Sequence, residues 1–270
     1  MSEQDQTPSS QGSPDGAEPE KQTEQHEADA SKPQPRSRGI YLLPNLFTSA
    51  ALFSGFYAVI AAMDGSFEKA AIAIFVSMVL DGLDGRVARM TNTQSEFGAQ
   101  YDSLADMVSF GVAPALVAFT WVLHEAGRFG WFAAFVFVAG AALRLARFNT
   151  QIGSVDKRYF IGLASPAAAA VIAGMIWVGA EFNIDPSQYA PVISVFVAVM
   201  GVLMVSNFHY HSFKDIDLKG KVPFVALLGA VLVIGVISID PAVLLWLIFV
   251  VYACSGPVQA VLRYRKKSVG

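Results

Sequence analysis

The chain has 270 residues, of which 54% are hydrophobic and only 15% are charged, and its mean hydropathy is +0.46. A soluble globular domain carries about 25% charged residues, so this composition excludes an ordinary soluble fold and indicates a membrane protein. The net charge of −3 says little about partners, because eight acidic residues in the N-terminal tail mask a basic remainder; we expect no nucleic-acid partner. The single cysteine, Cys254, excludes an intrachain disulfide and a structural zinc site built from cysteines.

The first 38 residues differ in composition from all that follows. They are rich in Gln, Ser, Pro, Asp and Glu, and they contain no aromatic residue, Leu, Ile or Val. Such a segment cannot bury enough apolar surface to offset the entropy of ordering it. We therefore expect a disordered acidic tail over 1–38, which lacks the apolar core of a signal peptide. A transmembrane catalytic domain over 39–262 and a basic tail over 263–270 complete the predicted organisation.

Long apolar segments occupy the rest of the chain. A helix needs roughly 20 apolar residues to cross about 30 Å of hydrocarbon. We predict an all-α polytopic protein with about eight spans, of which the last two follow one another after a very short turn. Six spans followed by a buried hairpin is the alternative. The eight predicted spans lie near residues 45–63, 68–86, 102–123, 129–149, 163–181, 189–207, 222–239 and 241–262.

Lys and Arg are distributed unevenly between alternate loops. One set of loops contains only Lys69 and Arg128, whereas the other set contains fifteen basic residues. Because cytoplasmic loops carry the excess of Lys and Arg, we expect both termini to lie in the cytoplasm. We expect the membrane to be the inner or plasma membrane of the cell. The fifteen are Arg36, Arg38, Arg86, Arg89, Arg144, Arg147, Lys157, Arg158, Lys214, Lys219, Lys221, Arg263, Arg265, Lys266 and Lys267.

Four aspartates stand at the facing ends of the second and third predicted spans. Asp81 and Asp84 are three residues apart, and Asp102 and Asp106 are four residues apart, so each pair shares one face of its helix. An antiparallel pair of helices would bring all four carboxylates together at the side of the membrane that is rich in Lys and Arg. We expect a single acidic site there.

A cluster of four carboxylates in this position needs compensating charge. An ionised Asp at mid-membrane depth costs about 2.5–3.5 kcal/mol. One interpretation is that Arg86 and Arg89 neutralise ordinary helix-end carboxylates, but two cations are too few for four acids. Two Mg²⁺ or Mn²⁺ ions that share carboxylate ligands would balance them. No His or Cys has ligand spacing nearby, which argues against zinc.

The complete pattern resembles the signature of the CDP-alcohol phosphatidyltransferases, at eight specified positions with fixed spacing. It reads Asp81-x2-Asp84-Gly85-x2-Ala88-Arg89-x8-Gly98-x3-Asp102-x3-Asp106. The resemblance implies a six-helix core, here with two extra C-terminal helices, that forms a homodimer in the bilayer. It also implies transfer of the phosphatidyl group of CDP-diacylglycerol to an alcohol.

The resemblance also assigns roles to individual residues. One cation would be held by Asp81, Asp84 and Asp102. A second would be held by Asp81, Asp102 and Asp106. Asp106 would also be the general base that deprotonates the attacking hydroxyl. The residues that would contact the CDP-diacylglycerol head group are Asn45, Gly85, Arg89 and Ser95.

The acceptor alcohol is suggested by other parts of the chain. Segments 39–48, 143–149, 160–169 and 206–215 resemble the branch of the family that uses L-serine, although Ala164 stands where that branch has proline. Arg144, Arg147 and Asn149 are the candidates for binding serine, because a guanidinium binds a carboxylate bidentately.

Three alternatives to this assignment stay open. The two arginines could instead anchor a helix end at the lipid headgroups. The acceptor could be glycerol 3-phosphate, inositol phosphate or choline. A cation-coupled transporter is a third candidate, but transport carboxylates lie near the midplane on broken helices, whereas these four gather at one end of adjacent spans.

Overall fold

The computed structural model describes residues 42–91, 93, 95–151, 159–211, 229, 231–232 and 235–268. Residues 38–270 form one compact unit. The predicted tail over 1–38, and most of the predicted span over 222–239, lie outside the described residues. The described chain is helical apart from turns and one pair of three-residue strands, which confirms the predicted all-α class.

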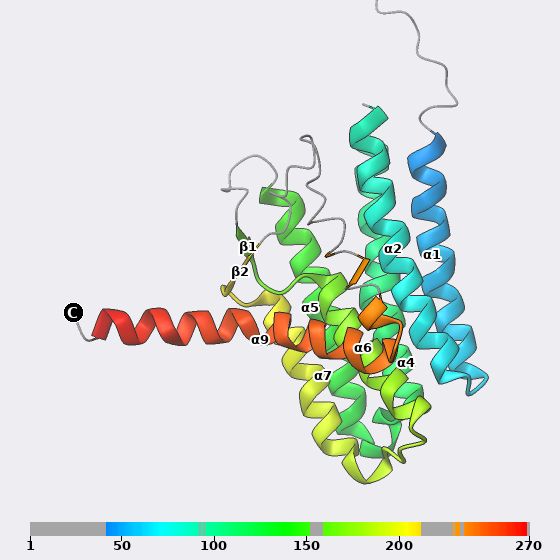
Figure 1. The fold of residues 1–270 in the computed structure, drawn as a ribbon, viewed down its shortest axis with the longest axis vertical. Coiled ribbons are helices and arrows are strands. Elements are labelled where there is room, and N and C mark those ends of the chain that lie inside the picture. The colour runs from blue at the N-terminus through cyan, green and yellow to red at the C-terminus, as the bar shows by residue number, and fades with distance from the viewer. Residues whose placement is uncertain are drawn as a thin grey trace, which may run out of the picture. The chain divides into compact units, whose positions relative to one another are not determined.

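Six helical segments pack along one another and position the acidic residues (Figure 1). The third segment is continuous from Glu96 to Trp121 but contains a π-helical stretch, η2, in its middle. The segments are α1 (Leu42–Met63), α2 (Phe67–Thr91), α3 (Glu96–Asp106) with η2 (Met107–Val112) and α4 (Ala113–Trp121), α5 (Arg128–Gln151), α6 (Ser165–Glu181) and α7 (Ala190–Val205).

Smaller elements and one long helix complete the described chain. Two short 3-10 helices lie in the turns before α5 and α7, namely η3 (Leu123–Ala126) and η4 (Ser187–Tyr189). Strands β1 (Tyr159–Ile161) and β2 (His209–His211) pair antiparallel, with Phe160 opposite Tyr210. The sequence did not indicate this pairing. Helix α9 (Pro241–Ser268) crosses α6 rather than running beside it (Figure 1).

Five of the described helices are long and apolar enough to cross a membrane, so this is an integral membrane protein. Helix α2 has 25 residues but is not among the five, since it carries charged residues of the acidic pattern. Helix α6 is apolar but has only 17 residues. The count of eight spans stays a prediction, because 222–239 is largely outside the described residues. The five spans are Leu43–Met63, Glu96–Trp121, Arg128–Thr150, Ser187–Val205 and Pro241–Leu262.

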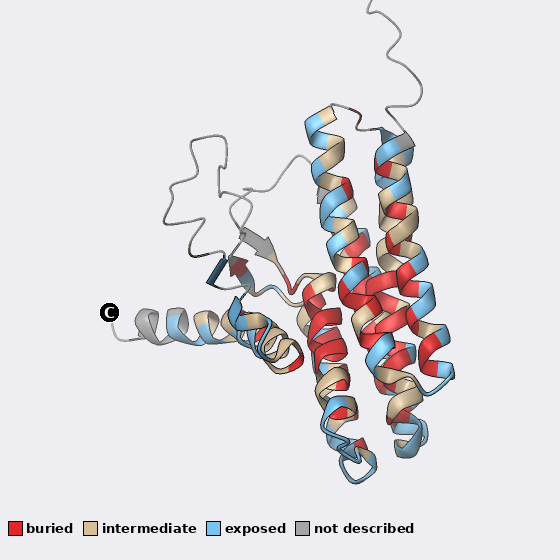
Figure 2. Cartoon of the chain, turned by 45° about the vertical axis from the view of Figure 1, so that its right-hand side comes forward, coloured by how far each residue is buried: buried red, intermediate tan, exposed pale blue. Residues whose placement is uncertain are grey.

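Burial is concentrated between the helices, while their outer faces are exposed and apolar. Buried residues line the inner faces of the bundle (Figure 2). Large hydrophobic side chains such as Phe53, Phe132 and Val192 are more than half exposed. An outer surface of this kind is stable in lipid and unfavourable in water. The core itself is built largely from small residues, including Ala167–Ala170 of α6, which allow the helices to approach closely.

Helices α5 and α7 come into backbone contact through two glycines. A Cβ atom placed on Gly140 would lie 2.3 Å from the carbonyl oxygen of Gly201. One placed on Gly201 would lie 2.7 Å from the Cα of Phe137. Real Cβ atoms do not approach other atoms this closely, so only glycine permits the crossing.

Replacing Gly140 by valine should therefore separate α5 from α7 and lower the free energy of unfolding by about 1–3 kcal/mol. The measurement is the thermal unfolding midpoint of the purified protein in detergent. The matched control is Ala142→Val on the same helix, because Ala142 is exposed. Equal midpoints for the two variants would contradict the role of the glycine contact.

Candidate active site

The structure brings three of the four aspartates together at the junction of α2 and α3. Asp81 comes from α2, and Asp102 and Asp106 come from α3. Each offers a carboxylate oxygen, and these oxygens lie within 4.8 Å of one another. All three side chains are partly buried. Among the described residues this is the group of acidic side chains with the spacing of a metal site.

The fourth aspartate, Asp84, lies one turn further along α2 and has a different environment. It is 5% exposed, and one of its carboxylate oxygens accepts a 2.7 Å hydrogen bond from the Thr48 hydroxyl of α1. Asp84 therefore lies beside the trio rather than within it. It lines a cavity to which Asp102 also contributes, so the two parts of the acidic site are contiguous.

The donor set of the trio fits a divalent cation. Oδ1 of Asp102 is buried and has no hydrogen-bond partner among the described residues. Buried polar atoms are nearly always satisfied, so an orphaned carboxylate oxygen beside two further carboxylates needs a positive partner. Carboxylate oxygens are the ligands that hard divalent cations prefer. The acidic cluster can thus hold a divalent cation through Asp81, Asp102 and Asp106.

The positions of the aspartates depend on a polar contact between three helices. The carbonyl oxygen of Ala51 in α1 accepts hydrogen bonds from the Ser77 hydroxyl of α2, at 2.8 Å, and from the Ser109 hydroxyl of η2, at 3.2 Å. Ser77 lies one turn before Asp81, and Ser109 lies three residues after Asp106. These two bonds therefore set the relative heights of the carboxylates on α2 and α3.

A cavity of about 220 Å³ opens between α1, α2 and the start of α3. All four residues that the resemblance assigns to the CDP-diacylglycerol head group line it, together with Asp84 and Asp102. Gly98 has no side chain to crowd the Ser95 hydroxyl, since a Cβ there would lie 3.0 Å from that oxygen. The lining residues are Pro44, Asn45, Thr48, Asp84, Gly85, Ala88, Arg89, Thr93, Ser95, Gly98, Ala99 and Asp102.

Of the three predicted serine-binding residues, Arg144 lies within electrostatic reach of the acidic cluster. Its guanidinium donates a 2.8 Å hydrogen bond to the hydroxyl of Ser165, at the start of α6. It is also close enough to Asp106 and Asp81 to interact with their charges. Arg144 is therefore a partly buried cation between the carboxylates and the N-terminus of α6.

Arg147 is occupied elsewhere, so its geometry does not support the predicted contact with serine. Its guanidinium donates to the carbonyl oxygens of Ile161 at 2.8 Å and Val205 at 3.0 Å, with longer bonds to Met204 and Ser206. These are carbonyls at the end of α7 and in the segment that enters α6. A cation that satisfies the last carbonyls of a helix has a structural role.

The third candidate, Asn149, ties α5 to α3. Its side-chain amide donates a 3.1 Å hydrogen bond to the hydroxyl of Ser103, which is the neighbour of Asp102. Thr48, Ser103 and Ser165 were not predicted from the sequence. For Thr48 a signal existed, since it lies three residues after Asn45 and so shares its helix face.

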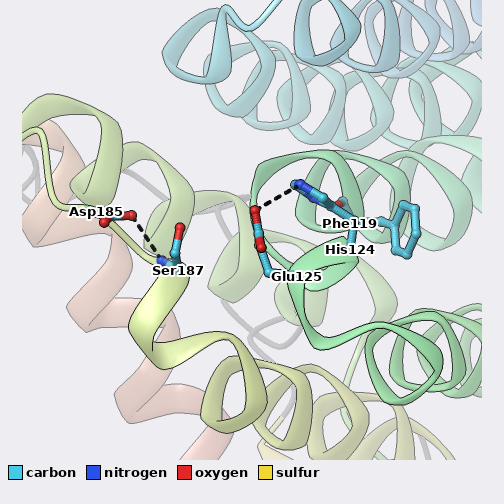
Figure 3. Close-up of polar contacts among 5 residues, drawn as sticks. All are labelled: Phe119, His124, Glu125, Asp185 and Ser187. Carbon is cyan, nitrogen blue, oxygen red and sulfur yellow. Dashed lines mark hydrogen bonds and ion pairs between the residues drawn. The ribbon is translucent and has the colours of Figure 1, made fainter.

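Polar residues at the opposite ends of the helices make contacts of an ordinary surface kind. Nε2 of His124 lies 3.4 Å from a carboxylate oxygen of Glu125, and the backbone N–H of Ser187 donates to Asp185 at 3.1 Å (Figure 3). That hydrogen bond holds the pKa of the exposed Asp185 below its usual value. A cavity of about 500 Å³ at this end is lined by Glu68, Lys69 and Asp185 among others. No metal-spaced trio occurs here among the residues that are described.

Comparison with known proteins identifies the family. The sequence model of the CDP-alcohol phosphatidyltransferases matches residues 41–206, well over half of the chain. This chain belongs to the CDP-alcohol phosphatidyltransferase family. The resemblance recognised in the aspartate pattern is thereby confirmed, and the protein is a membrane-embedded phosphotransferase. The matched region covers α1 to α7, whereas α9 lies beyond it.

Several curated relatives carry the name CDP-diacylglycerol–serine O-phosphatidyltransferase. One from Helicobacter pylori is 41% identical over 177 residues, which cover 66% of this chain and 75% of the relative. One from Mycobacterium tuberculosis is 33% identical over 234 residues, covering 83% and 81%. One from Methanocaldococcus jannaschii is 33% identical over 180 residues, covering 66% and 79%.

Replacing Asp102 by asparagine should lower the affinity for Mn²⁺ by more than about tenfold, because it removes a carboxylate from the centre of the trio. Free Mn²⁺ measured by electron paramagnetic resonance during titration of the purified protein gives the affinity directly. The control is Asp185→Asn, which removes an exposed carboxylate at the opposite end of the helices. Equal Mn²⁺ binding by the two variants would contradict a cation site at the trio.

Proposed function

We propose that this enzyme transfers the phosphatidyl group of CDP-diacylglycerol to the hydroxyl of L-serine and releases CMP, as a step of phospholipid biosynthesis. The observation that carries the proposal is the cavity shared by the acidic site and the four predicted head-group residues. This shared cavity supports binding of a diphosphate beside cations that the carboxylates hold at the ends of the membrane helices. The names of the relatives support serine as the acceptor.

The nucleotide end of the donor would occupy this cavity. Arg89 brings a guanidinium that can bind phosphate oxygens bidentately. Gly85 has no side chain, so a phosphate or ribose can approach the backbone of α2. Asn45 and Ser95 supply an amide and a hydroxyl for hydrogen bonds from the opposite wall. The acyl chains would remain in the surrounding lipid.

We further propose that the site holds two cations, Mg²⁺ or Mn²⁺. Asp81, Asp84 and Asp102 would ligate one, and Asp81, Asp102 and Asp106 the other. The spacing of the trio supports the second set, and the cavity that Asp84 shares with Asp102 supports the first. When bound, the ions supply positive charge for the diphosphate and for the leaving CMP. The Mn²⁺ titration described above should saturate at two ions per chain, and saturation at one would contradict this arrangement.

Asp106 is the residue we assign as general base. Its side chain interacts with that of Asp81 and is within electrostatic reach of Arg144. In the reaction the serine oxygen forms a bond to the phosphorus that bears diacylglycerol, and the bond from that phosphorus to the oxygen of CMP breaks. The hydroxyl proton passes to the Asp106 carboxylate and then to solvent. A carboxylate suffices as base because the proton leaves only as the new bond develops.

Arg144 is the residue best placed to bind the carboxylate of serine. It is a cation beside the proposed base, and Ser165 orients it from α6. A phosphorylated acceptor such as glycerol 3-phosphate or inositol phosphate would need more basic residues, and Arg147 is already engaged with backbone carbonyls. Choline lacks an anionic group for Arg144 to bind. These considerations favour serine among the family's acceptors.

We also propose that the protein is a homodimer with its active site and both termini on the cytoplasmic side of the plasma or inner membrane. The excess of Lys and Arg in the loops on the active-site side supports the orientation. Within this arrangement 1–38 is an acidic tail, 39–262 the catalytic domain and 263–270 a basic tail. Protease access to the tail in inverted vesicles tests the orientation, and crosslinking in membranes tests the dimer.

With CDP-diacylglycerol, Mn²⁺ or Mg²⁺ and a panel of labelled alcohols, the purified enzyme should release CMP and form labelled lipid with L-serine. The measurement combines CMP release with chromatography of the lipid product. Glycerol 3-phosphate, inositol phosphate and choline serve as the comparison acceptors. Lipid formed from glycerol 3-phosphate but not from serine would contradict serine as the acceptor. It would not affect the assignment to the family.

Changing Asp106 to asparagine should lower kcat by about 10²–10⁴-fold or more, because the acceptor proton then has no base. Binding of CDP, measured by isothermal titration at saturating Mn²⁺, should be largely retained, because the first proposed cation is held by Asp81, Asp84 and Asp102. The control variant is Asp64→Asn in the exposed turn after α1, which should keep full turnover. Normal turnover by Asp106→Asn would remove this residue from the mechanism.

A further inference from the structure

Three side-chain hydroxyls form hydrogen bonds between α1 and α2. Ser54 of α1 and Ser77 of α2 each donate to a backbone carbonyl of the other helix, at 2.7 Å and 2.8 Å. The third hydroxyl is that of Thr48 in α1, and its acceptor is the carboxylate of Asp84 in α2. The first two bonds hold the helices together, whereas the third also acts on an ionisable side chain of the acidic site.

The hydrogen bond from Thr48 to Asp84 is short and buried. Its length is 2.7 Å, and the two residues are 4% and 5% exposed. A hydroxyl that donates to a carboxylate away from water makes a stronger contact than a neutral pair does. The Thr48 hydroxyl oxygen also lies 3.2 Å from the carbonyl oxygen of Pro44, four residues earlier in α1. That second contact and the β-branch of threonine restrict its rotamer, so the hydroxyl stays directed at Asp84.

The location of Asp84 explains why its orientation needs support. Asp84 lines the cavity with Asp102, but it is not one of the three aspartates whose oxygens lie within 4.8 Å of one another. Asp81 precedes it by three residues on the same helix face, and like charges at this spacing repel. A hydrogen bond to one carboxylate oxygen opposes rotation of the group. It therefore also fixes the direction in which the other oxygen points.

We propose that Thr48 is a positioning residue for the cation that Asp84 would share with Asp81 and Asp102. The Thr48 hydroxyl holds the Asp84 carboxylate in the orientation that binds this ion, and it acts through Asp84 without contacting the ion itself. The inference rests on the proposed function and deepens its two-cation arrangement. The other cation does not depend on Thr48, because Asp84 is not among its proposed ligands.

Thr48 also connects this cation to the donor cavity. It follows Asn45 by three residues on α1, and both residues line the cavity together with Asp84. A diphosphate in the cavity would lie between α1 and the Asp84 cation, and the Thr48 bond fixes one relative to the other. All the proposed ligands remain when the hydroxyl is removed. Its loss should therefore raise the Mn²⁺ concentration that the enzyme needs, while kcat at saturating Mn²⁺ stays close to the wild-type value.

The test removes the Thr48 hydroxyl in Thr48→Val and Thr48→Ala and retains it in Thr48→Ser, so one folded variant without the hydroxyl suffices. Mn²⁺ binding to the purified full-length protein is measured by electron paramagnetic resonance without substrates. The wild type and Thr48→Ser should bind two ions per chain with similar affinities. In the valine and alanine variants one of the two ions should bind about 10–100-fold more weakly, as expected when a metal ligand loses its hydrogen-bond partner. The half-saturating Mn²⁺ concentration for CMP release should rise by a similar factor.

The matched control is Ser54→Ala, which removes a hydroxyl from the same pair of helices but leaves the aspartates untouched. It should lower the thermal unfolding midpoint and leave both Mn²⁺ affinities unchanged. An equal loss of Mn²⁺ affinity in Ser54→Ala would indicate a general effect of helix packing and overturn the inference. Affinity in Thr48→Ser as low as in Thr48→Val would overturn it too, because the effect would then belong to the methyl group.

The remaining outcomes separate the inference from the function on which it rests. Two ions bound with wild-type affinities in both Thr48→Val and Thr48→Ala would overturn the role of Thr48 alone. Saturation of the wild type at one ion would overturn that role together with the two-cation arrangement. The Mn²⁺ titration contains no acceptor, so it decides the role of Thr48 whichever alcohol is the substrate. A wild-type enzyme that forms no phosphatidylserine would contradict the proposed function instead.

Discussion

Repulsion between carboxylates held at the end of membrane helices is the constraint on which this structure depends. Asp81, Asp102 and Asp106 place oxygens within 4.8 Å of one another, where water is limited and like charges interact strongly. Such an arrangement is unstable unless positive charge is supplied. Arg144 supplies part of it from within the chain. The orphaned Oδ1 of Asp102 fits a divalent cation as the source of the remainder.

The scaffold holds this unfavourable cluster with contacts that are strong in an apolar medium. Two hydroxyls, from Ser77 and Ser109, bind the single carbonyl of Ala51 and so tie three helices together just below the site. Glycines let backbones touch where α5 crosses α7. Hydrogen bonds and close packing are the interactions available between helices in lipid, because the hydrophobic effect does not favour helix association there. The hydrogen bonds to Ala51 therefore hold the helices together directly beside the acidic site.

The charged residues of the site differ in their roles because their surroundings differ. Asp84 accepts a hydrogen bond from Thr48 and borders the cavity between α1, α2 and α3, whereas Asp81 and Asp106 of the trio lie within electrostatic reach of Arg144. Two arginines one turn apart on α5 have opposite roles. Arg144 faces the acidic site, and Arg147 satisfies carbonyls at the end of α7. In the proposed function, donor recognition belongs to α1, α2 and α3, and acceptor recognition to α5 and α6.

Much of the site could be predicted from the sequence because its determinants are local. The spacing of the four aspartates, together with the cost of burying them, indicated a cation site without any knowledge of the fold. Apolar segment lengths predicted the membrane helices in the same way, because hydrocarbon thickness sets the number of residues. The pairing of β1 with β2, and the crossing of α9 over α6, depend on contacts between distant segments and had no local signal.

What the sequence by itself determined was the chemistry: carboxylates at helical spacing, in a chain too apolar to be soluble. Only the tertiary structure decided which charged side chains take part. It set Asp84 apart from the trio, and it turned Arg147 away toward backbone carbonyls. The reason is that helical periodicity specifies which residues share a face, whereas the partner of that face depends on how whole helices pack.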